Sequence, residues 1–301
     1  MIVENKFIKM KTNENSIRKI FSVASTEYVK WICNPRMIVM FVVFIFIYDY
    51  IIKEMIKGAV KMDTLISVSE PFIATTNSTL LILFVPAVFI MLISDFPKTD
   101  GNTMFFICRT GKFNWILGQI VFSIYTSVTY LFTIFISTCV LVSKYAYVGN
   151  DWSAVATKYG LIFPDEKGGR IANFITGRLY NNMTPVKALI RTFTLQFLYL
   201  MLISMMLLTG FAIGKRMLGM IISCGVICLG SGLSLSSSDL KWWFPSTNSI
   251  AWMHYDMVLK KQIVDMTRSY LYFIILIILL LIASLIFIKR YDFSKVTDME
   301  D

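Results

Sequence analysis

The chain carries little charge for its length. Only 16% of its 301 residues are Asp, Glu, Lys or Arg, and 56% are hydrophobic. A soluble domain usually has about 25% charged residues. This composition excludes an ordinary soluble protein and predicts a protein that crosses the membrane several times.

Histidine and cysteine are too sparse to build a metal or disulfide site. His254 is the single histidine, and the five cysteines follow no ligand or disulfide spacing. Cys224 and Cys228 share a helix face, but two thiols without a nearby histidine make a poor metal site. A lone histidine is more often structural than catalytic. We expect no metal, no disulfide framework and no cofactor bound by this chain.

Motifs for nucleotide hydrolysis and for nucleophilic catalysis are also missing. The run closest to G-x-x-x-x-G-K-[ST] lies at 210–216, where the spacing is wrong. The sequence has no H-E-x-x-H motif and no nucleophile elbow. We therefore expect that the chain is not an enzyme and that ATP-driven work would need a partner.

The net charge of +10 does not indicate a nucleic-acid partner. The basic residues are scattered at the ends of apolar segments, where anionic lipid headgroups account for them. No platform of alternating aromatic and basic residues is present, so we expect the lipid bilayer, and no nucleic acid, as a partner.

Long apolar runs are what the sequence has in abundance. A membrane-spanning helix needs about 20 predominantly apolar residues. The runs predict a single all-α membrane domain over 1–301 with six spans, at 37–52, 76–94, 115–143, 188–214, 217–232 and 269–288. Between them we expect a short loop at 53–72, a polar cap or loop at 144–186, and helices on the outer leaflet or a loop at 233–268.

The residues before the first span predict a helix lying in the membrane interface. Residues 16–31 carry one apolar stripe, formed by Ile17, Phe21, Ala24, Tyr28 and Trp31, and amphipathic helices of this kind lie flat at the headgroups. Asn34-Pro35-Arg36 then ends the helix, because proline has no N–H to donate. The basic residues on this side indicate that both termini are cytoplasmic, although the outer loops also contain lysines.

The segment from Ser94 to Trp115, between the second and third spans, predicts a small folded element. Asp95-Phe96-Pro97 stops the preceding helix, and Asp100-Gly101-Asn102 offers a turn and a helix N-cap. Residues 103–108 can then form about two helical turns, with Arg109 and Lys112 near the C-terminal end. An ordinary loop with a basic membrane anchor remains an equal alternative.

Polar residues inside the predicted spans are candidates for a substrate path, because lipid cannot satisfy them. The candidates are Asp49, Tyr125, Tyr130 and Gln196. Helix packing explains the last three equally well, and Asp49 can instead pair with Lys53. The fifth span is rich in glycine and serine, which predicts close helix packing in the bundle or at a subunit interface.

The interfacial helix ending in N-P-R, the six spans and the D-F-P-x-x-D-G-N…R-T-G-K-x-x-W loop together resemble the permease subunit of type-two ATP-binding-cassette transporters. The resemblance implies that this loop carries a coupling helix that docks on a separate ATPase subunit. The residues it assigns to that contact are Phe96, Asp100, Met104, Phe105, Phe106, Arg109 and Lys112.

The resemblance also implies an assembly of two permease chains, identical or homologous, with two ATPases that bind ATP and Mg. Such a unit in a bacterial cell membrane usually exports a peptide, a lipid or a hydrophobic drug-like molecule. Two alternatives stay open: an ATP-independent secondary carrier, for which broken spans or ion-binding carboxylates are expected, and a receptor or immunity protein that sequesters a ligand.

Overall fold

The computed structural model describes residues 17–78, 80–99, 101–166, 168–236, 238–257 and 262–291. In this part of the chain nearly all regular structure is helical, and β1 (Ile66–Ser67) and β2 (Ala146–Tyr147) form one short parallel pair. The prediction of an all-α fold is confirmed.

Among the described residues, five helical stretches are long and apolar enough to cross a membrane. They are Pro35–Met62, α8 with the turn that follows it (Lys112–Tyr145), α12 (Pro185–Ala212), α13 (Arg216–Ser234) and α15 (Met266–Arg290). A sixth crossing exists if α5 (Glu70–Asn77) and α6 (Leu81–Leu92), which meet at 87°, count as one broken span. The chain is a membrane protein.

The first helical stretch is longer than predicted. It runs through η1 (Pro35–Ile38), α3 (Val39–Ile47) and the π-helical η2 (Tyr48–Ile52) into α4 (Lys53–Met62), so the expected loop at 53–72 is wrong over its first half. Lysine–carboxylate pairs one turn apart support the helix on its exposed side, as in Lys57–Glu54 at 2.6 Å. Asp63, with φ of 50°, ends it in the left-handed conformation.

The second span is not the continuous helix predicted at 76–94. The chain leaves α5 at Asn77, Ser78 is extended, and α6 begins at Leu81 in a new direction. Every residue of α5 is buried. The sequence shows no glycine or proline at the bend, so apolar content alone suggested a straight span.

The predicted cap at 144–186 is a folded unit. It contains η3 (Ser143–Tyr145), α9 (Ala154–Ile162), η4 (Pro164–Glu166), α10 (Arg170–Asn173) and α11 (Gly177–Tyr180). The cap packs on α4, where Gly58 leaves room for Val155 and Ile171. Three further short helices cover the bundle at the same end: η5 (Asp239–Trp243), α14 (Pro245–Ser249) and η6 (Ala251–His254).

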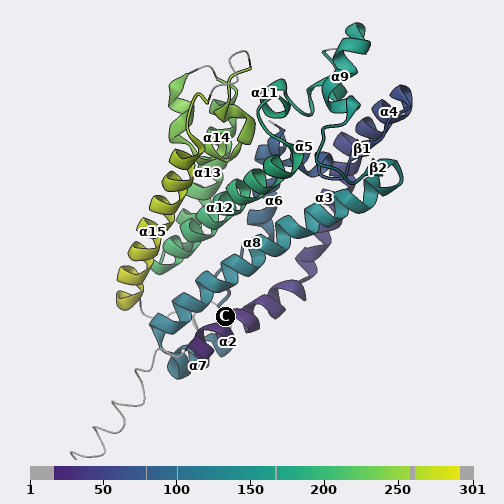
Figure 1. Cartoon of the computed structure of the whole chain (residues 1–301). Helices are drawn as coiled ribbons and strands as arrows, with labels where there is room; N and C mark the ends of the chain where they lie inside the picture. Colours follow the sequence, from purple (N-terminus) through teal and green to yellow (C-terminus); the bar gives the residue numbers. More distant parts are fainter. Residues whose placement is uncertain are drawn as a thin grey trace, which may run out of the picture.

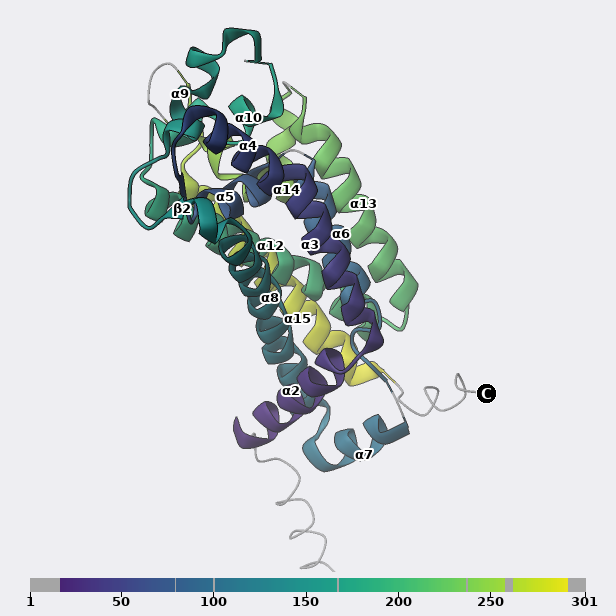
Figure 2. The ribbon, with the colours of Figure 1, turned by 90° about the vertical axis from the view of Figure 1, so that its right-hand side faces the viewer.

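Helix α12 forms the centre of the bundle, since most of its residues are buried against α15, α13 and α8 (Lys112–Val142). The cap and α14 lie at one end of the molecule, and α7 (Gly101–Thr110) lies at the other end beside the start of α2 (Ile17–Ile32), as Figure 1 and Figure 2 show. We call these the cap end and the α7 end.

Two glycines let α12 and α13 approach closely. A Cβ atom added to Gly219 would lie 3.1 Å from the Cα of Gly210 and 3.1 Å from the carbonyl oxygen of Met206. Gly225, two turns further along α13, would meet nothing within 4 Å. The small residues of the predicted fifth span therefore serve internal packing at Gly219, whereas Gly225 faces outward.

We predict that Gly219→Val destabilises the protein, because a branched side chain must push apart two helix backbones. Overpacking of this kind costs about 1–3 kcal/mol. Thermal unfolding in detergent measures it, with Gly225→Val as the matched control that introduces the same side chain where space is open. Equal melting temperatures for the two variants would contradict the packing described above.

Candidate functional site

Helix α7 follows α6 and precedes α8 in the chain. It is a short helix at the end of the bundle opposite the cap (Figure 2). It spans Gly101–Thr110, which is longer than the two turns predicted. Gly111 ends it with φ of 84°, a conformation that glycine adopts without steric cost. The structure thus has the helix and the glycine stop and not the loop that the sequence left as an equal alternative, and the helix begins at Gly101, two residues earlier than predicted.

One face of α7 is seated on the bundle and another is free. Thr103, Ile107 and Thr110 are buried, whereas Cys108 and Arg109 are exposed. Ile107 belongs to an apolar cluster that joins α7 to four other helices, with Val23, Trp115, Ile116, Phe211, Ala212 and Ile288. Helix α7 therefore contacts α2 and α8 and shares one apolar cluster with α12 and α15.

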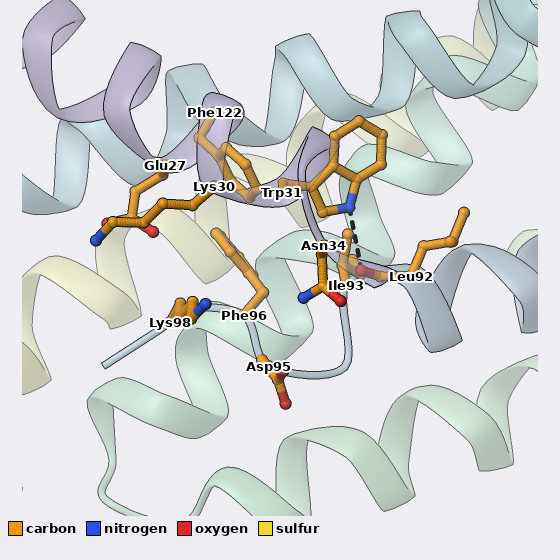
Figure 3. Close-up of a pocket in the computed structure, with 10 residues that line it drawn as sticks. All are labelled: Glu27, Lys30, Trp31, Asn34, Leu92, Ile93, Asp95, Phe96, Lys98 and Phe122. Atoms are coloured by element: carbon orange, nitrogen blue, oxygen red, sulfur yellow. Dashed lines mark hydrogen bonds and ion pairs between the residues drawn. The ribbon is translucent and has the colours of Figure 1, made fainter. Parts of the chain in front are cut away.

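The chain that leads into α7 is fastened to α2 and to the start of the first span (Figure 3). The Trp31 indole N–H donates to the Leu92 carbonyl oxygen at 3.0 Å. Arg36 forms an ion pair with Asp95 and donates to the Ser94 hydroxyl at 2.6 Å. The N-P-R and D-F-P motifs, almost sixty residues apart, therefore meet directly.

The buried side chain of Phe96 anchors the segment before α7 to α8. Its ring stacks on Phe122 of α8 with the centroids 5.3 Å apart, and the side chain is buried. Both residues line a small pocket of about 30 Å³ together with Glu27, Lys30 and Asp95 (Figure 3). Phe96 therefore belongs to the support of α7 and not to its exposed surface.

The start of α8 is tied to the end of α15. The Trp115 ring lies 5.8 Å from that of Phe211, which in turn lies 5.0 Å from the ring of Tyr291. Lys112 donates to the Tyr291 carbonyl oxygen at 2.7 Å. The residue that follows the last span is thus anchored beside α7.

Of the seven residues assigned to the coupling contact, four have described side chains, and these four fall into three groups. Arg109 is exposed on α7. Phe106 is half-buried, and the Lys30 ammonium lies 5.9 Å from its ring centroid. Phe96 and Lys112 lie in the segments before and after α7, where they contact Phe122 and Tyr291. Asp100 and the side chains of Met104 and Phe105 lie outside the described residues.

The four residues predicted for a substrate path each have a separate partner. Asp49 pairs with Lys53 at 2.7 Å, which is the alternative that the sequence left open. The other three make contacts between helices. The Tyr125 ring packs edge-on against Tyr28. Tyr130 donates to the Val85 carbonyl at 2.8 Å, and Gln196 donates to the Thr76 carbonyl at 3.1 Å. The structure does not bring these four together.

A buried polar contact that the sequence did not reveal lies at the bend after α5. The Asn77 amide donates to the Thr192 hydroxyl at 3.1 Å and accepts from the Ala251 N–H at 3.0 Å. The Trp252 indole N–H donates to the Asn77 carbonyl at 2.9 Å. One side chain therefore ties the broken span to α12 and to η6, and only the folded chain brings these partners together.

His254 is part of a buried chain of hydrogen bonds. Its Nε2 lies 2.8 Å from the Ser269 hydroxyl, which lies 2.7 Å from the Asn248 side-chain oxygen, and its Nδ1 lies 3.0 Å from the Ile250 carbonyl. Burial lowers the pKa of the imidazole. The ring is fully enclosed, so this serine–histidine contact fastens α14 and η6 to α15 rather than facing a substrate.

No protein-family model matches the chain, and no curated protein or solved structure matches it either. Within the described residues, no group of three or more His, Cys, Asp or Glu side chains could hold a metal ion. Functional assignment therefore rests on the sequence motifs and on the geometry around α7.

We predict that the buried ring of Phe96 stabilises the segment before α7 more than the Arg36–Asp95 ion pair does. Truncating a buried phenylalanine costs about 3–5 kcal/mol, whereas a partly exposed pair contributes about 0–1 kcal/mol. Unfolding of Phe96→Ala and Arg36→Ala in detergent compares them. A larger loss of stability in Arg36→Ala would show that the ion pair dominates.

Proposed function

We propose that this chain is the membrane-spanning permease subunit of a type-two ATP-binding-cassette transporter. In this proposal α7 is the coupling helix, and a separate ATPase subunit binds its exposed face. The observation that carries the proposal is a short helix held rigidly between two membrane segments, with Arg109 and Cys108 pointing away from the bundle.

Rigid seating is what a coupling element requires. A helix on flexible tethers would absorb a push from a partner, whereas packed interiors transmit displacement because they have few voids. Ile107 shares an apolar cluster with residues of α2, α8, α12 and α15, and the Arg36–Asp95 contact joins the preceding segment to the first span. Movement of α7 would therefore displace the helices of this cluster and the first span.

The remaining parts of the proposal follow from this role. The chain has no ATP-binding motif, so the partner ATPase would hold ATP and Mg, and a second permease, identical or homologous, would complete the path. The bent α5–α6 pair is then the second of six spans, α2 is the interfacial elbow helix, and both termini and α7 are cytoplasmic. The substrate class is a peptide, a lipid or a hydrophobic drug-like molecule that is exported.

An ATP-independent carrier is the second candidate, and the broken span favours it. Secondary carriers bind substrates and ions where helices are interrupted near the bilayer centre. At this bend, however, Asn77 is already engaged by neighbouring helices. Glu70, the carboxylate of α5, accepts from the Ser153 N–H and hydroxyl at 2.6 and 2.7 Å. Asn77 and Glu70 therefore use their polar groups in hydrogen bonds within the chain, and not for a substrate or an ion.

The exposed arginine of α7 gives the most direct test of ATPase binding. We predict that Arg109→Glu weakens copurification of a Walker-motif ATPase from native membranes by about tenfold or more, because reversing a charge in a docked face places it against its former partner. Arg18→Glu, an equally exposed arginine on α2, is the matched control and should retain the ATPase. Failure of the unmodified chain to retain any ATPase would contradict the proposed function.

A further inference from the structure

Two adjoining hollows lie at the cap end, opposite α7. The first, of about 270 Å³, is bounded by Tyr50, by the bend at Asn77 and by Arg170. The second, of about 480 Å³, lies between α9 and α11 and includes Arg178. Asn173, Thr176 and Trp252 line both. We call the joined hollows the cap trough.

Each hollow of the cap trough has one arginine held against an aromatic ring. The Arg170 guanidinium carbon lies 5.1 Å from the centroid of Tyr50, and that of Arg178 lies 5.7 Å from the centroid of Trp252. Stacking orients a guanidinium and leaves its N–H groups free to donate in its plane. Toward the described residues, neither guanidinium donates a hydrogen bond or forms an ion pair.

Three lysines at the cap end have carboxylate partners, whereas Lys158, Lys187 and Arg268 form no ion pair with a described residue. Lys53 pairs with Asp49, Lys57 with Glu54, and Lys61 with Glu166. The hydrogen bond from Lys61 holds the pKa of Glu166 below its usual value. The guanidinium groups of Arg170 and Arg178 form no such pair with a described residue, and Arg170 also lines a neighbouring hollow that contains Glu54, Asp165 and Glu166.

The wall shared by the two hollows contains a further unused polar atom. The Thr176 hydroxyl oxygen is buried and has no hydrogen-bond partner. A buried polar group without a partner costs about 1–3 kcal/mol, so an acceptor or donor brought by a ligand would remove this cost. Apolar surface from Phe174, Leu161 and Met257 lines the remainder of the trough.

We propose that the cap trough binds a short peptide with apolar side chains through its carboxylate group. A guanidinium donates two parallel hydrogen bonds to a carboxylate, and the combined hollows are of the size that small ligands occupy, roughly 300–1,000 Å³. A peptide suits a trough in which an arginine lies in each hollow and polar and apolar side chains share the walls. This site is separate from the α7 surface and does not depend on an ATPase.

A pair of peptides that differ only at the carboxyl end tests the site. The purified chain in phosphatidylcholine nanodiscs is titrated with acetyl-Phe-Leu-Phe as the free acid and as the amide, by calorimetry at low salt. We expect the free acid to bind about tenfold more tightly than the amide, the loss expected for one charge-assisted contact. Equal binding of the two peptides, or no binding of either, overturns the proposal.

Variants assign the binding to the cap trough. Arg170→Gln combined with Arg178→Gln should reduce binding of the free acid to the level of the amide. Arg268→Gln, which removes an exposed arginine at the same end but outside the trough, should leave binding unchanged. Unaltered thermal unfolding verifies that each variant is folded, and a full effect of Arg268→Gln would place the anion elsewhere.

A lipid phosphate is the other anion available near this end. If phosphatidylglycerol in the nanodisc displaces the free acid from the unmodified chain, the trough is a headgroup site and the peptide proposal is wrong. The peptide titrations use the purified chain without an ATPase, so a negative result would not bear on the proposed ATPase contact. In the same way, failure of ATPase copurification would not bear on peptide binding in the cap trough.

Discussion

The backbone of a membrane protein must satisfy its own hydrogen bonds, because lipid offers no partners. The break between α5 and α6 meets this requirement through Asn77, whose amide and carbonyl contact Thr192, Ala251 and Trp252. These bonds join the bend to α12 and to the η6 segment. Because Asn77 bonds to Ala251 and Trp252, η6 and the neighbouring α14 lie over the bend. The contact between His254 and Ser269 then joins them to α15.

The α7 end is organised by apolar packing instead. Ile107, Trp115 and Phe211 make one cluster from three helices, and Phe96 inserts beside Phe122. Polar contacts such as Arg36–Asp95 set the direction of the chain on the outside of this cluster. The result is a short helix with a fixed position, as a surface that receives force from a partner would require.

The sequence predicted the helical class, most of the long apolar helices, and α7 with its glycine stop, because these depend on local composition and chain geometry. It did not predict the bend at Asn77, because no proline or glycine marks it and its partners are more than a hundred residues away. The sequence did not predict that the first helix extends through α4, because the apolar run that indicated the span ends before Lys53. Arg170 and Arg178 carried no signal in the sequence, since their stacking on Tyr50 and Trp252 exists only in the folded cap.

The central claim is that α7 meets an ATPase, and the exposed Cys108 allows this to be measured directly. In a variant that keeps Cys108 and lacks the other four cysteines, a thiol-linked photo-crosslinker is activated in native membranes, and the adducts are identified by mass spectrometry. If an ATPase docks on α7, we expect an adduct with a protein that contains a Walker motif. Efficient labelling of Cys108 by the reagent, with adducts to lipid or to other proteins and none to an ATPase, would contradict it.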